Sequence, residues 1–160
     1  MCSVTGLFHV GITVSDLERS LAFYAGALGL EVEWDQVIDR DSTRELVGVP
    51  FRTLRCAFLA VPGGGALEIL EYDGVTGRDL TWSPSDHGAG HLCLWVADVD
   101  DVVARARELG GVTIAQAPVV VPSGRYAGAR AVYLRDPDGF LLELIQPPPP
   151  SAPAGSTPPP

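Results

Sequence analysis

Two stretches of this chain repeat one pattern: FHVGITVSDLERSLAFYAGALGLEV (residues 8–32) and GHLCLWVADVDDVVARARELGGV (residues 90–112). Each contains a histidine near its start, His9 or His91, and the residues that follow match at a constant offset of 82. A second pair of matching segments lies downstream, AFLAVPGGGALEIL (57–70) and VYLRDPDGFLLELI (132–145), at an offset of 75. Because neither copy is large enough to bury its own apolar face, the repeat predicts two modules that complete one another.

Each copy has the pattern of one helix and four strands. Ser15 and Glu18 have capping-box spacing, which predicts a helix that ends at Gly29, and Asp98 is the expected N-cap of the matching helix. Runs of apolar and β-branched residues between turn signals predict strands over 7–14, 31–38, 52–60 and 66–72, and over 90–96, 112–116, 129–135 and 140–146. Each copy is therefore a βαβββ unit.

We expect one domain over residues 1–146 and a tail. The fold class is α+β, with two βαβββ modules over about 7–72 and 89–146, a linker over 73–88, and a metal site between the modules. The final residues 147–160, PPPPSAPAGSTPPP, predict a disordered proline-rich tail, because proline removes a backbone donor and fixes φ.

Composition restricts the compartment and the partners. The 160 residues are 46% hydrophobic, yet no apolar run approaches the roughly 20 residues of a membrane-spanning helix. The net charge of −9 repels phosphate, so neither nucleic acid nor an anionic membrane is an expected partner. Three cysteines, Cys2, Cys56 and Cys93, lack paired spacing and argue against a disulfide framework. We therefore expect a cytoplasmic protein that acts on a small molecule.

Four residues at repeat-equivalent positions are candidate metal ligands: His9, Glu68, His91 and Glu143. Both carboxylates interrupt apolar runs, ALEIL and LLELI. Two imidazoles and two carboxylates suit Zn, Ni, Co or Mn, with Fe less favoured, and they suit calcium poorly. An octahedral ion would keep two adjacent positions for two substrate oxygens, and Glu68 or Glu143 would move a proton as the catalytic carboxylate.

Other interpretations of these residues stay open. Taken singly, a strand histidine is more often a structural group and a lone glutamate is more often solvated. A ring-cleaving dioxygenase needs about three open positions at iron, which requires displacement of Glu68. A non-catalytic drug-binding protein would use the apolar, aromatic-lined concavity that strand alternation predicts around Trp95.

Several further side chains are weaker candidates. His87 is expected in a loop, because Gly88 and Gly90, which follow it, disfavour a helix there. Cys93 is expected to be inert packing more than a reactive thiol. Arg125, Tyr126 and Arg130 lie in or beside a predicted loop that is either a cover for a substrate carboxylate or phosphate, or ordinary surface charge.

The segments HVGITVSDLERSLAFYAGALGLEV, GHLCLWVADVDDV and RDPDGFLLELIQ resemble the vicinal oxygen chelate superfamily. This superfamily includes glyoxalase I, methylmalonyl-CoA epimerase, extradiol dioxygenases, fosfomycin-resistance enzymes and bleomycin-binding proteins. The resemblance covers about residues 7–146 and is closest to glyoxalase I-like and epimerase-like members, whose four metal ligands match His9, Glu68, His91 and Glu143. It implies paired βαβββ modules that form a half-barrel around the metal. It also implies a metal-dependent lyase or isomerase, usually a homodimer, that enolises a small carbonyl or thioester substrate.

The chain also departs from these relatives. Bacterial glyoxalases that bind glutathione tend to carry an arginine four residues after the first histidine and an asparagine four residues after the first glutamate. Thr13 and Tyr72 stand at those positions here, so glutathione is not implied. Glu45, in STRELVGVPF, is either the counterpart of the epimerases' second catalytic acid or a solvated loop residue. The sequence fits a metal centre within one chain and one shared by two chains equally well.

Overall fold

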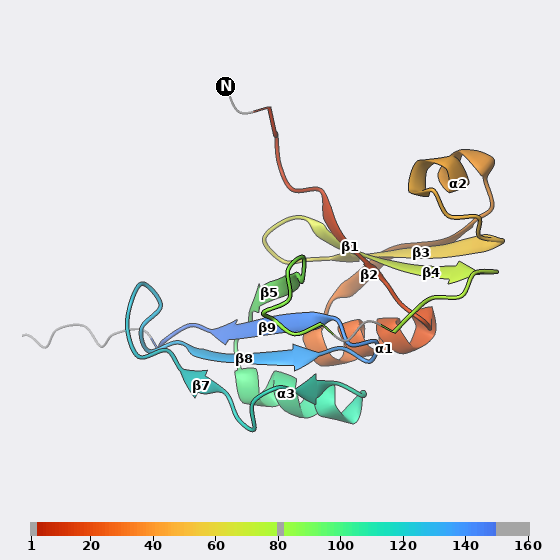
Figure 1. The fold of residues 1–160 in the computed structure, drawn as a ribbon. Coiled ribbons are helices and arrows are strands. Elements are labelled where there is room, and N and C mark those ends of the chain that lie inside the picture. Colours follow the sequence, from red (N-terminus) through yellow and green to blue (C-terminus); the bar gives the residue numbers. More distant parts are fainter. Residues whose placement is uncertain (1–2, 80–81, 150–160) are drawn as a thin grey trace, which may run out of the picture.

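The computed structural model describes residues 3–79 and 82–149, which form two modules (Figure 1). The first module contains, in order, β1 (His9–Thr13), α1 (Leu17–Leu28), β2 (Glu31–Ile38), α2 (Asp41–Val47), β3 (Thr53–Ala60) and β4 (Ala66–Asp73). The second contains β5 (His91–Trp95), α3 (Val99–Glu108), β6 (Val112–Thr113), β7 (Val119–Val120), β8 (Arg130–Arg135) and β9 (Leu141–Gln146).

Each module builds its own sheet with the same topology. The first sheet has the strand order β1-β4-β3-β2, and the second has β5-β9-β8-β6 with β7 also paired to β8. In both, the first strand runs parallel to the last strand of its module, and the other pairs are antiparallel. The predicted α+β class is confirmed. Within the described residues the two sheets form no closed barrel.

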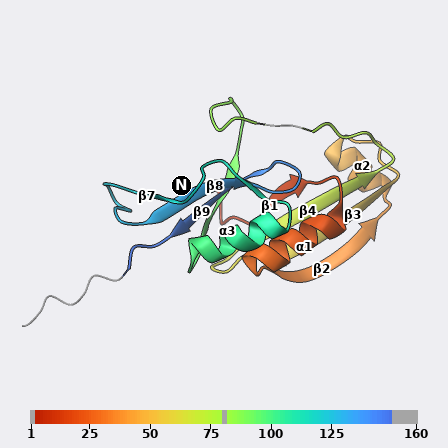
Figure 2. The ribbon, with the colours of Figure 1, turned by 90° about the horizontal axis from the view of Figure 1, so that it is seen from below.

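The two modules pack against one another through their helices. Figure 2 shows α1 and α3 side by side in front of the strands, and residues of both helices and both sheets belong to one hydrophobic cluster. Arg105 of α3 also donates from Nε to the Ala27 carbonyl at the end of α1, at 3.2 Å. This shared core covers the helix side of each sheet, and it leaves the opposite face of each sheet uncovered. The fully buried side chains of the shared core are Leu17, Phe23, Tyr24, Ala27, Ala57, Leu59, Leu67, Ile69, Val99, Leu134, Leu142 and Leu144.

The helix starts follow the sequence with one correction. Asp98 caps α3 as predicted, because its side chain accepts from the backbone N–H groups of Asp100 and Asp101. The N-cap of α1 is Asp16 and not Ser15. The Ser15 hydroxyl instead donates to Asp138 in the second module, which removes it from the helix. Gly29 ends α1 as predicted, with the left-handed φ of 70° that favours glycine.

A polar side chain of the last strand ties each sheet to its helix. The Glu71 carboxylate in β4 accepts from the first amide of α1, Leu17 N–H, at 3.1 Å. In the second module the Gln146 side-chain oxygen accepts from Val99 N–H, the first amide of α3, also at 3.1 Å. Both contacts satisfy a helix-terminal donor that has no partner inside the helix. These two hydrogen bonds fix the position of the last strand relative to the helix in each module.

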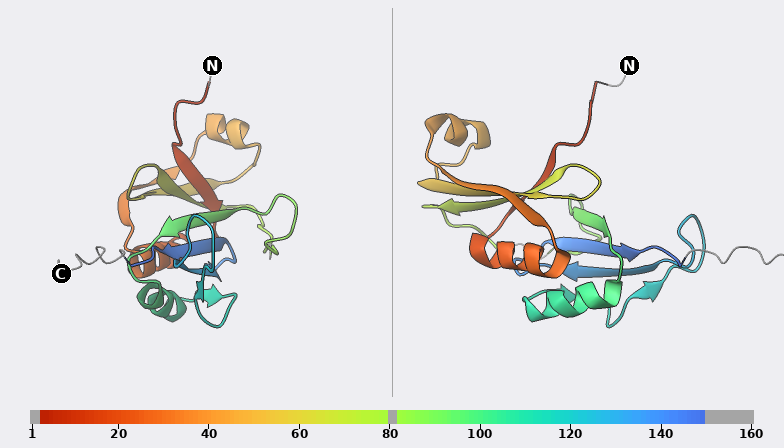
Figure 3. Two further views of the ribbon diagram at one scale, coloured as in Figure 1. Left: turned by 90° about the vertical axis from the view of Figure 1, so that its left-hand side faces the viewer. Right: turned by 180° about the vertical axis from the view of Figure 1, so that it is seen from behind.

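Two segments differ from the predicted elements. Residues 41–47, expected as a loop, form α2, which stands apart at one end of the first sheet (Figure 3). The strand predicted over 112–116 is shorter, and the chain returns to β8 at Val119–Val120 after Pro118, which cannot donate a ladder hydrogen bond. The proline-rich tail prediction falls mostly on residues 150–160, outside the described residues, so the division at residue 146 stays a prediction. Across the described stretches, no helix is long and apolar enough to cross a membrane.

Candidate metal centre

Strand alternation separates a core side from a site side in both modules. In β5, Leu92 and Leu94 pack against the core, whereas His91, Cys93 and Trp95 are on the opposite, exposed face. In β1 the buried residue is Ile12, so His9 and Gly11 lie on the side away from the helices. The repeat therefore places each histidine on the face that the core leaves uncovered.

Each histidine meets the glutamate of its own module. His9 Nε2 lies 3.2 Å from Glu68 Oε2, and His91 Nε2 lies 3.2 Å from Glu143 Oε2. The histidine side chains are 32% and 42% exposed and the glutamates 19% and 20%. We call His9 with Glu68 the first half-site, and His91 with Glu143 the second half-site. The two histidine–glutamate pairs, one in each module, thus have the same Nε2–Oε2 separation.

This geometry fits adjacent ligands of one ion. Nitrogen and oxygen ligands bind such ions at about 2.0–2.2 Å, so two that subtend a right angle are about 3 Å apart. Both Nε2–Oε2 separations are close to that value. Nε2 is the His9 nitrogen that faces Glu68. The other ring nitrogen, Nδ1, is buried and has no hydrogen-bond partner within the described residues. The residues present fit a divalent metal in donor type and in spacing.

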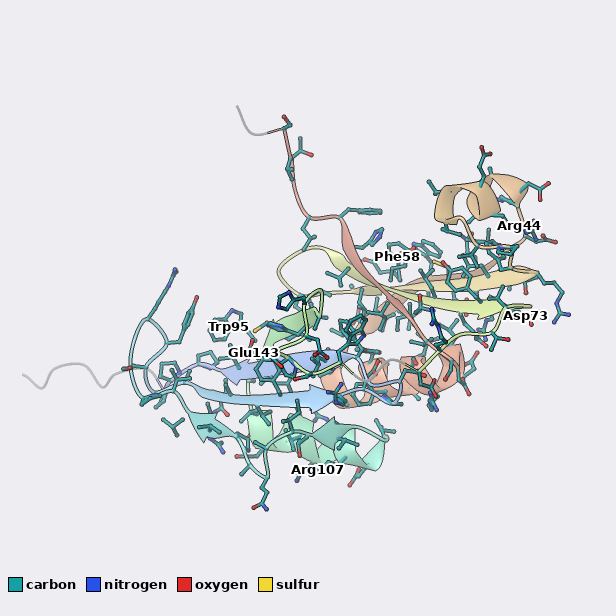
Figure 4. The ribbon with its side chains drawn as sticks, viewed as in Figure 1. Arg44, Phe58, Asp73, Trp95, Arg107 and Glu143 are labelled. Carbon is teal, nitrogen blue, oxygen red and sulfur yellow. The ribbon has the colours of Figure 1, made fainter. Side chains whose placement is uncertain are left out.

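The chain does not bring the four predicted ligands into one cluster. In residues 3–79 and 82–149, no group of three or more His, Cys, Asp or Glu side chains is arranged to hold a metal ion. Figure 4 shows Phe58 on the first sheet, with Trp95 and Glu143 on the second. Two surface hollows of about 460 and 400 Å³ are lined by residues other than the four predicted ligands.

Aromatic side chains surround the first half-site. The Phe58 ring meets the His9 ring edge-on at 5.3 Å and stacks on Trp34 at 4.6 Å with an interplanar angle of 17°. Phe8, which is 74% exposed, also contacts both the His9 and Phe58 rings. Gly11 leaves room for Glu68, because a Cβ atom there would lie 3.1 Å from Glu68 Oε2. The surroundings of the first half-site are therefore largely aromatic, and the Cys56 thiol donates to Glu68 Oε1 at 3.4 Å.

The second half-site has polar neighbours. The Tyr133 hydroxyl lies 3.3 Å from His91 Nε2, and Trp95 packs edge-on against Tyr126 at 5.6 Å. Burial, followed by the Glu143 carboxylate, raises the pKa of Tyr133, so its hydroxyl stays protonated at neutral pH. The Arg125 guanidinium lies over the Tyr126 ring at 5.5 Å. Opposite its glutamate, the second half-site thus carries a hydroxyl-bearing ring where the first carries Phe58.

The remaining candidates lie elsewhere or are already paired. Arg130 forms a two-pronged ion pair with Asp100 of α3, so it is not free to cover a substrate. His87 is in an exposed loop, as expected. Glu45 is exposed on α2, at the end of the first sheet where Thr53 pairs with Asp73, and the structure does not bring it to either half-site.

The described cysteines are free thiols. Desolvation, with Glu68 as the next cause, raises the pKa of Cys56 to about 12. Desolvation and Glu143 raise the pKa of Cys93 to about 11, although Cys93 is exposed and not buried as expected. In the protein without a metal ion, thiols with such pKa values stay protonated at neutral pH. Cys2 lies outside the described residues.

A family model matches the sequence over the part that carries both half-sites. The match is to the Glyoxalase/Bleomycin resistance protein/Dioxygenase superfamily, over residues 6–144. The chain belongs to this superfamily. This membership confirms the resemblance noted in the sequence.

Curated relatives of this superfamily chain are enzymes. It is 35% identical over 140 residues to a 2-epi-5-epi-valiolone epimerase of Actinomyces sp, covering 86% of this chain and 76% of the relative. It is 28% identical over 138 residues to a lactoylglutathione lyase of Arabidopsis thaliana, covering 86% of this chain but only 43% of that longer protein. A Bacillus cereus glyoxalase family protein shares the fold, with a TM-score of 0.77 and 19% identity over 92% of this chain and 97% of that one.

Two neighbours of the ligands were missed by sequence reasoning. Phe58 and Tyr133 each lie directly opposite the ligand glutamate on the neighbouring strand, in the register pairs Phe58–Glu68 and Tyr133–Glu143. Both stand ten residues before their glutamate, across a turn. Antiparallel pairing about the two turns was the available signal.

Proposed function

We propose that this superfamily member is a metal-dependent lyase or isomerase that enolises a small carbonyl or thioester substrate. The observation that supports this most directly is the pair of equivalent half-sites, each with an Nε2–Oε2 separation of 3.2 Å. Curated relatives named as an epimerase and a lyase agree with this reaction class. His9, Glu68, His91 and Glu143 are the proposed ligands.

The carboxylates perform the proton transfer in this proposal. A bound Zn, Ni, Co or Mn ion supplies Lewis-acid polarisation of a substrate oxygen. Either Glu68 or Glu143 then accepts the proton from the carbon next to the carbonyl and returns it to that carbon or to its neighbour. Return to the opposite face of the same carbon is epimerisation, and return to the neighbouring carbon is isomerisation.

We further propose that each centre joins the first half-site of one copy to the second half-site of another. The shared core and the Tyr24–Asp136 hydrogen bond hold the modules of one chain together through their helix sides, which turns the half-sites away from that contact. Exposed apolar side chains flank both half-sites, among them Phe8, Trp34 and Trp95. Such surfaces favour association, and a two-fold dimer would complete two centres at once.

A pair of complementary variants tests this arrangement. One carries His9→Ala with Glu68→Gln, and the other carries His91→Ala with Glu143→Gln. The two are co-expressed with different affinity tags, and the mixed dimer is isolated by tandem purification. Each variant alone should bind almost no metal, whereas the mixed dimer holds one intact centre of two and should recover about half of the wild-type metal content.

The outcomes separate the parts of the proposal. A mixed dimer that stays empty, beside a wild type that binds metal, contradicts the shared centre. A wild type that binds no Zn, Ni, Co or Mn contradicts the metal proposal and favours the drug-binding alternative. Iron binding with consumption of oxygen in the presence of a catechol favours the dioxygenase alternative.

The reaction class has its own measurement. Wild-type protein loaded with each metal is incubated in D₂O with hydroxyketones, acyl thioesters and methylglyoxal hemithioacetals, and deuterium uptake is followed by NMR. Enolisation exchanges the proton on the carbon next to the carbonyl for deuterium. Metal-loaded protein that accelerates exchange in none of these compounds would contradict the proposed chemistry.

A further inference from the structure

The two half-sites differ at the repeat-equivalent position that lies opposite each ligand glutamate. Phe58 and Tyr133 are related by the repeat offset of 75, and each is paired across the sheet with a ligand glutamate. Each ring also contacts its module's histidine, with centroid distances of 5.3 Å for Phe58–His9 and 5.2 Å for Tyr133–His91. An aromatic ring is thus retained at this position in both modules, and the hydroxyl distinguishes Tyr133 from Phe58.

The hydroxyl lies where a bound substrate would be held. Tyr133 Oη is 3.3 Å from His91 Nε2, the same nitrogen that faces Glu143. A nitrogen that ligates a metal has no lone pair left for a hydrogen bond, and it carries no proton to donate. In the proposed centre the Tyr133 hydroxyl therefore loses His91 as a partner. The Glu143 carboxylate stays beside it, and a substrate oxygen bound next to His91 is a further acceptor within its reach.

The opposite side of the assembled centre has different chemistry. Phe58 offers no hydrogen-bonding group, and Trp34 and Phe8 extend its apolar surface. When a first half-site meets a second, the substrate lies between an aromatic wall and a hydroxyl. The difference between the modules gives the centre a polar side and an apolar side.

We infer that Tyr133 is a substrate-binding residue that donates a hydrogen bond to a substrate oxygen, while Phe58 and Trp34 cover the apolar side of the same substrate. The substrate class is a small carbonyl compound with its oxygens gathered along one edge and hydrocarbon along the other. This inference rests on the proposed function, because it assumes that His91 ligates a metal.

The test uses acetohydroxamate, a small probe with two adjacent oxygens, and zinc-loaded full-length protein. Metal content is measured first, and probe affinity is then measured by calorimetry for wild type, Tyr133→Phe and the control Ser42→Ala, which removes an exposed hydroxyl from α2. Loss of a hydrogen bond to a charged oxygen should weaken probe binding by Tyr133→Phe about tenfold. Metal content should not change, and the control should match wild type.

Each other outcome has a definite meaning. Equal probe affinity for Tyr133→Phe and wild type, with metal retained, overturns the inference and leaves the proposed function intact. Loss of metal from Tyr133→Phe also overturns it, because Tyr133 then supports His91 and does not bind substrate. A wild type that takes up no zinc, nor any of the other proposed ions, refutes the proposed function itself, and the inference with it.

Discussion

Tyr24 in α1 donates a buried hydrogen bond of 2.9 Å to Asp136 Oδ2, which joins the two modules across 112 residues of sequence. The other oxygen of that carboxylate accepts from the backbone N–H groups of Asp138 and Phe140, at 3.0 and 2.8 Å. One side chain thus shapes the turn before β9 and anchors that turn to the first module. The orientation of the second half-site depends on this contact, since β9 carries Glu143.

Tyr24→Phe should therefore destabilise the protein. It leaves a buried carboxylate oxygen without its donor, which costs about 1–3 kcal/mol in the free energy of unfolding. Tyr126→Phe, which removes an exposed hydroxyl, should change that free energy by less than about 0.5 kcal/mol. Urea denaturation of the two variants and wild type measures both values. Equal stability of Tyr24→Phe and wild type would show that water replaces the tyrosine donor.

Asp136 should also make stability depend on pH. Burial raises its folded-state pKa above the ordinary value of 3.8, so the native state binds the proton more tightly than the unfolded chain does. Its contribution is greatest below the unfolded pKa, falls as the pH rises towards the folded pKa, and is constant above it. The difference in unfolding free energy between wild type and Asp136→Asn should accordingly fall as the pH rises from about 4. A difference that is independent of pH would contradict this assignment.

Glu68→Gln and Glu143→Gln should each reduce metal binding. The amide keeps the shape of the side chain and loses the negative charge that a divalent ion requires. We expect metal per chain, measured by elemental analysis after dialysis, to fall to a small fraction of the wild-type value in both variants. Glu108→Gln, at the exposed end of α3, is the matched control and should retain metal. Full occupancy in either half-site variant would remove that glutamate from the ligand set.

Gly11→Ala should weaken metal binding without unfolding the protein. The new Cβ would lie 3.1 Å from Glu68 Oε2, so the carboxylate must shift by a few tenths of an ångström. We expect about a tenfold loss of zinc affinity in competition with a chromogenic chelator, as is usual when the support of a ligand is disturbed. Gly6→Ala has nothing within 4 Å of its new methyl group and should bind zinc like wild type. Unchanged affinity in Gly11→Ala would mean that Glu68 is not a ligand.

Local patterns in the sequence predicted most of the elements, because the spacing of apolar residues in an element follows which of its side chains are buried. α2 was missed because DSTRELV has no buried residue at all. Arg44 holds that segment instead, through Asp39, Asp41 and the Phe51 carbonyl. The N-cap of α1 was wrong by one residue because Ser15 is engaged by Asp138, a partner 123 residues away. Contacts over such separations leave no periodic signal.

The candidate site was predictable in part for the same reason. The repeat located all four proposed ligands, and parallel pairing of the first and last strands brings each histidine to its glutamate. Whether the two pairs meet depends on how the modules pack, and that is decided by α1, α3 and the Tyr24–Asp136 contact. The residues beside the ligands, Phe58 and Tyr133, required the strand register as well.

The helix contacts of Glu71 and Gln146 have a consequence for the ligands, because each stands three residues after a proposed ligand on the same strand. An odd separation puts the two side chains on opposite faces of the sheet, so Glu71 reaches the helix while Glu68 faces His9. A slip of one residue along β4 would turn Glu68 towards the core, and it would also break the hydrogen bond between Glu71 and the helix amide. The helix amide in each module therefore favours the correct register of the last strand. In that register the glutamate ligand lies on the face of the sheet that carries the histidine.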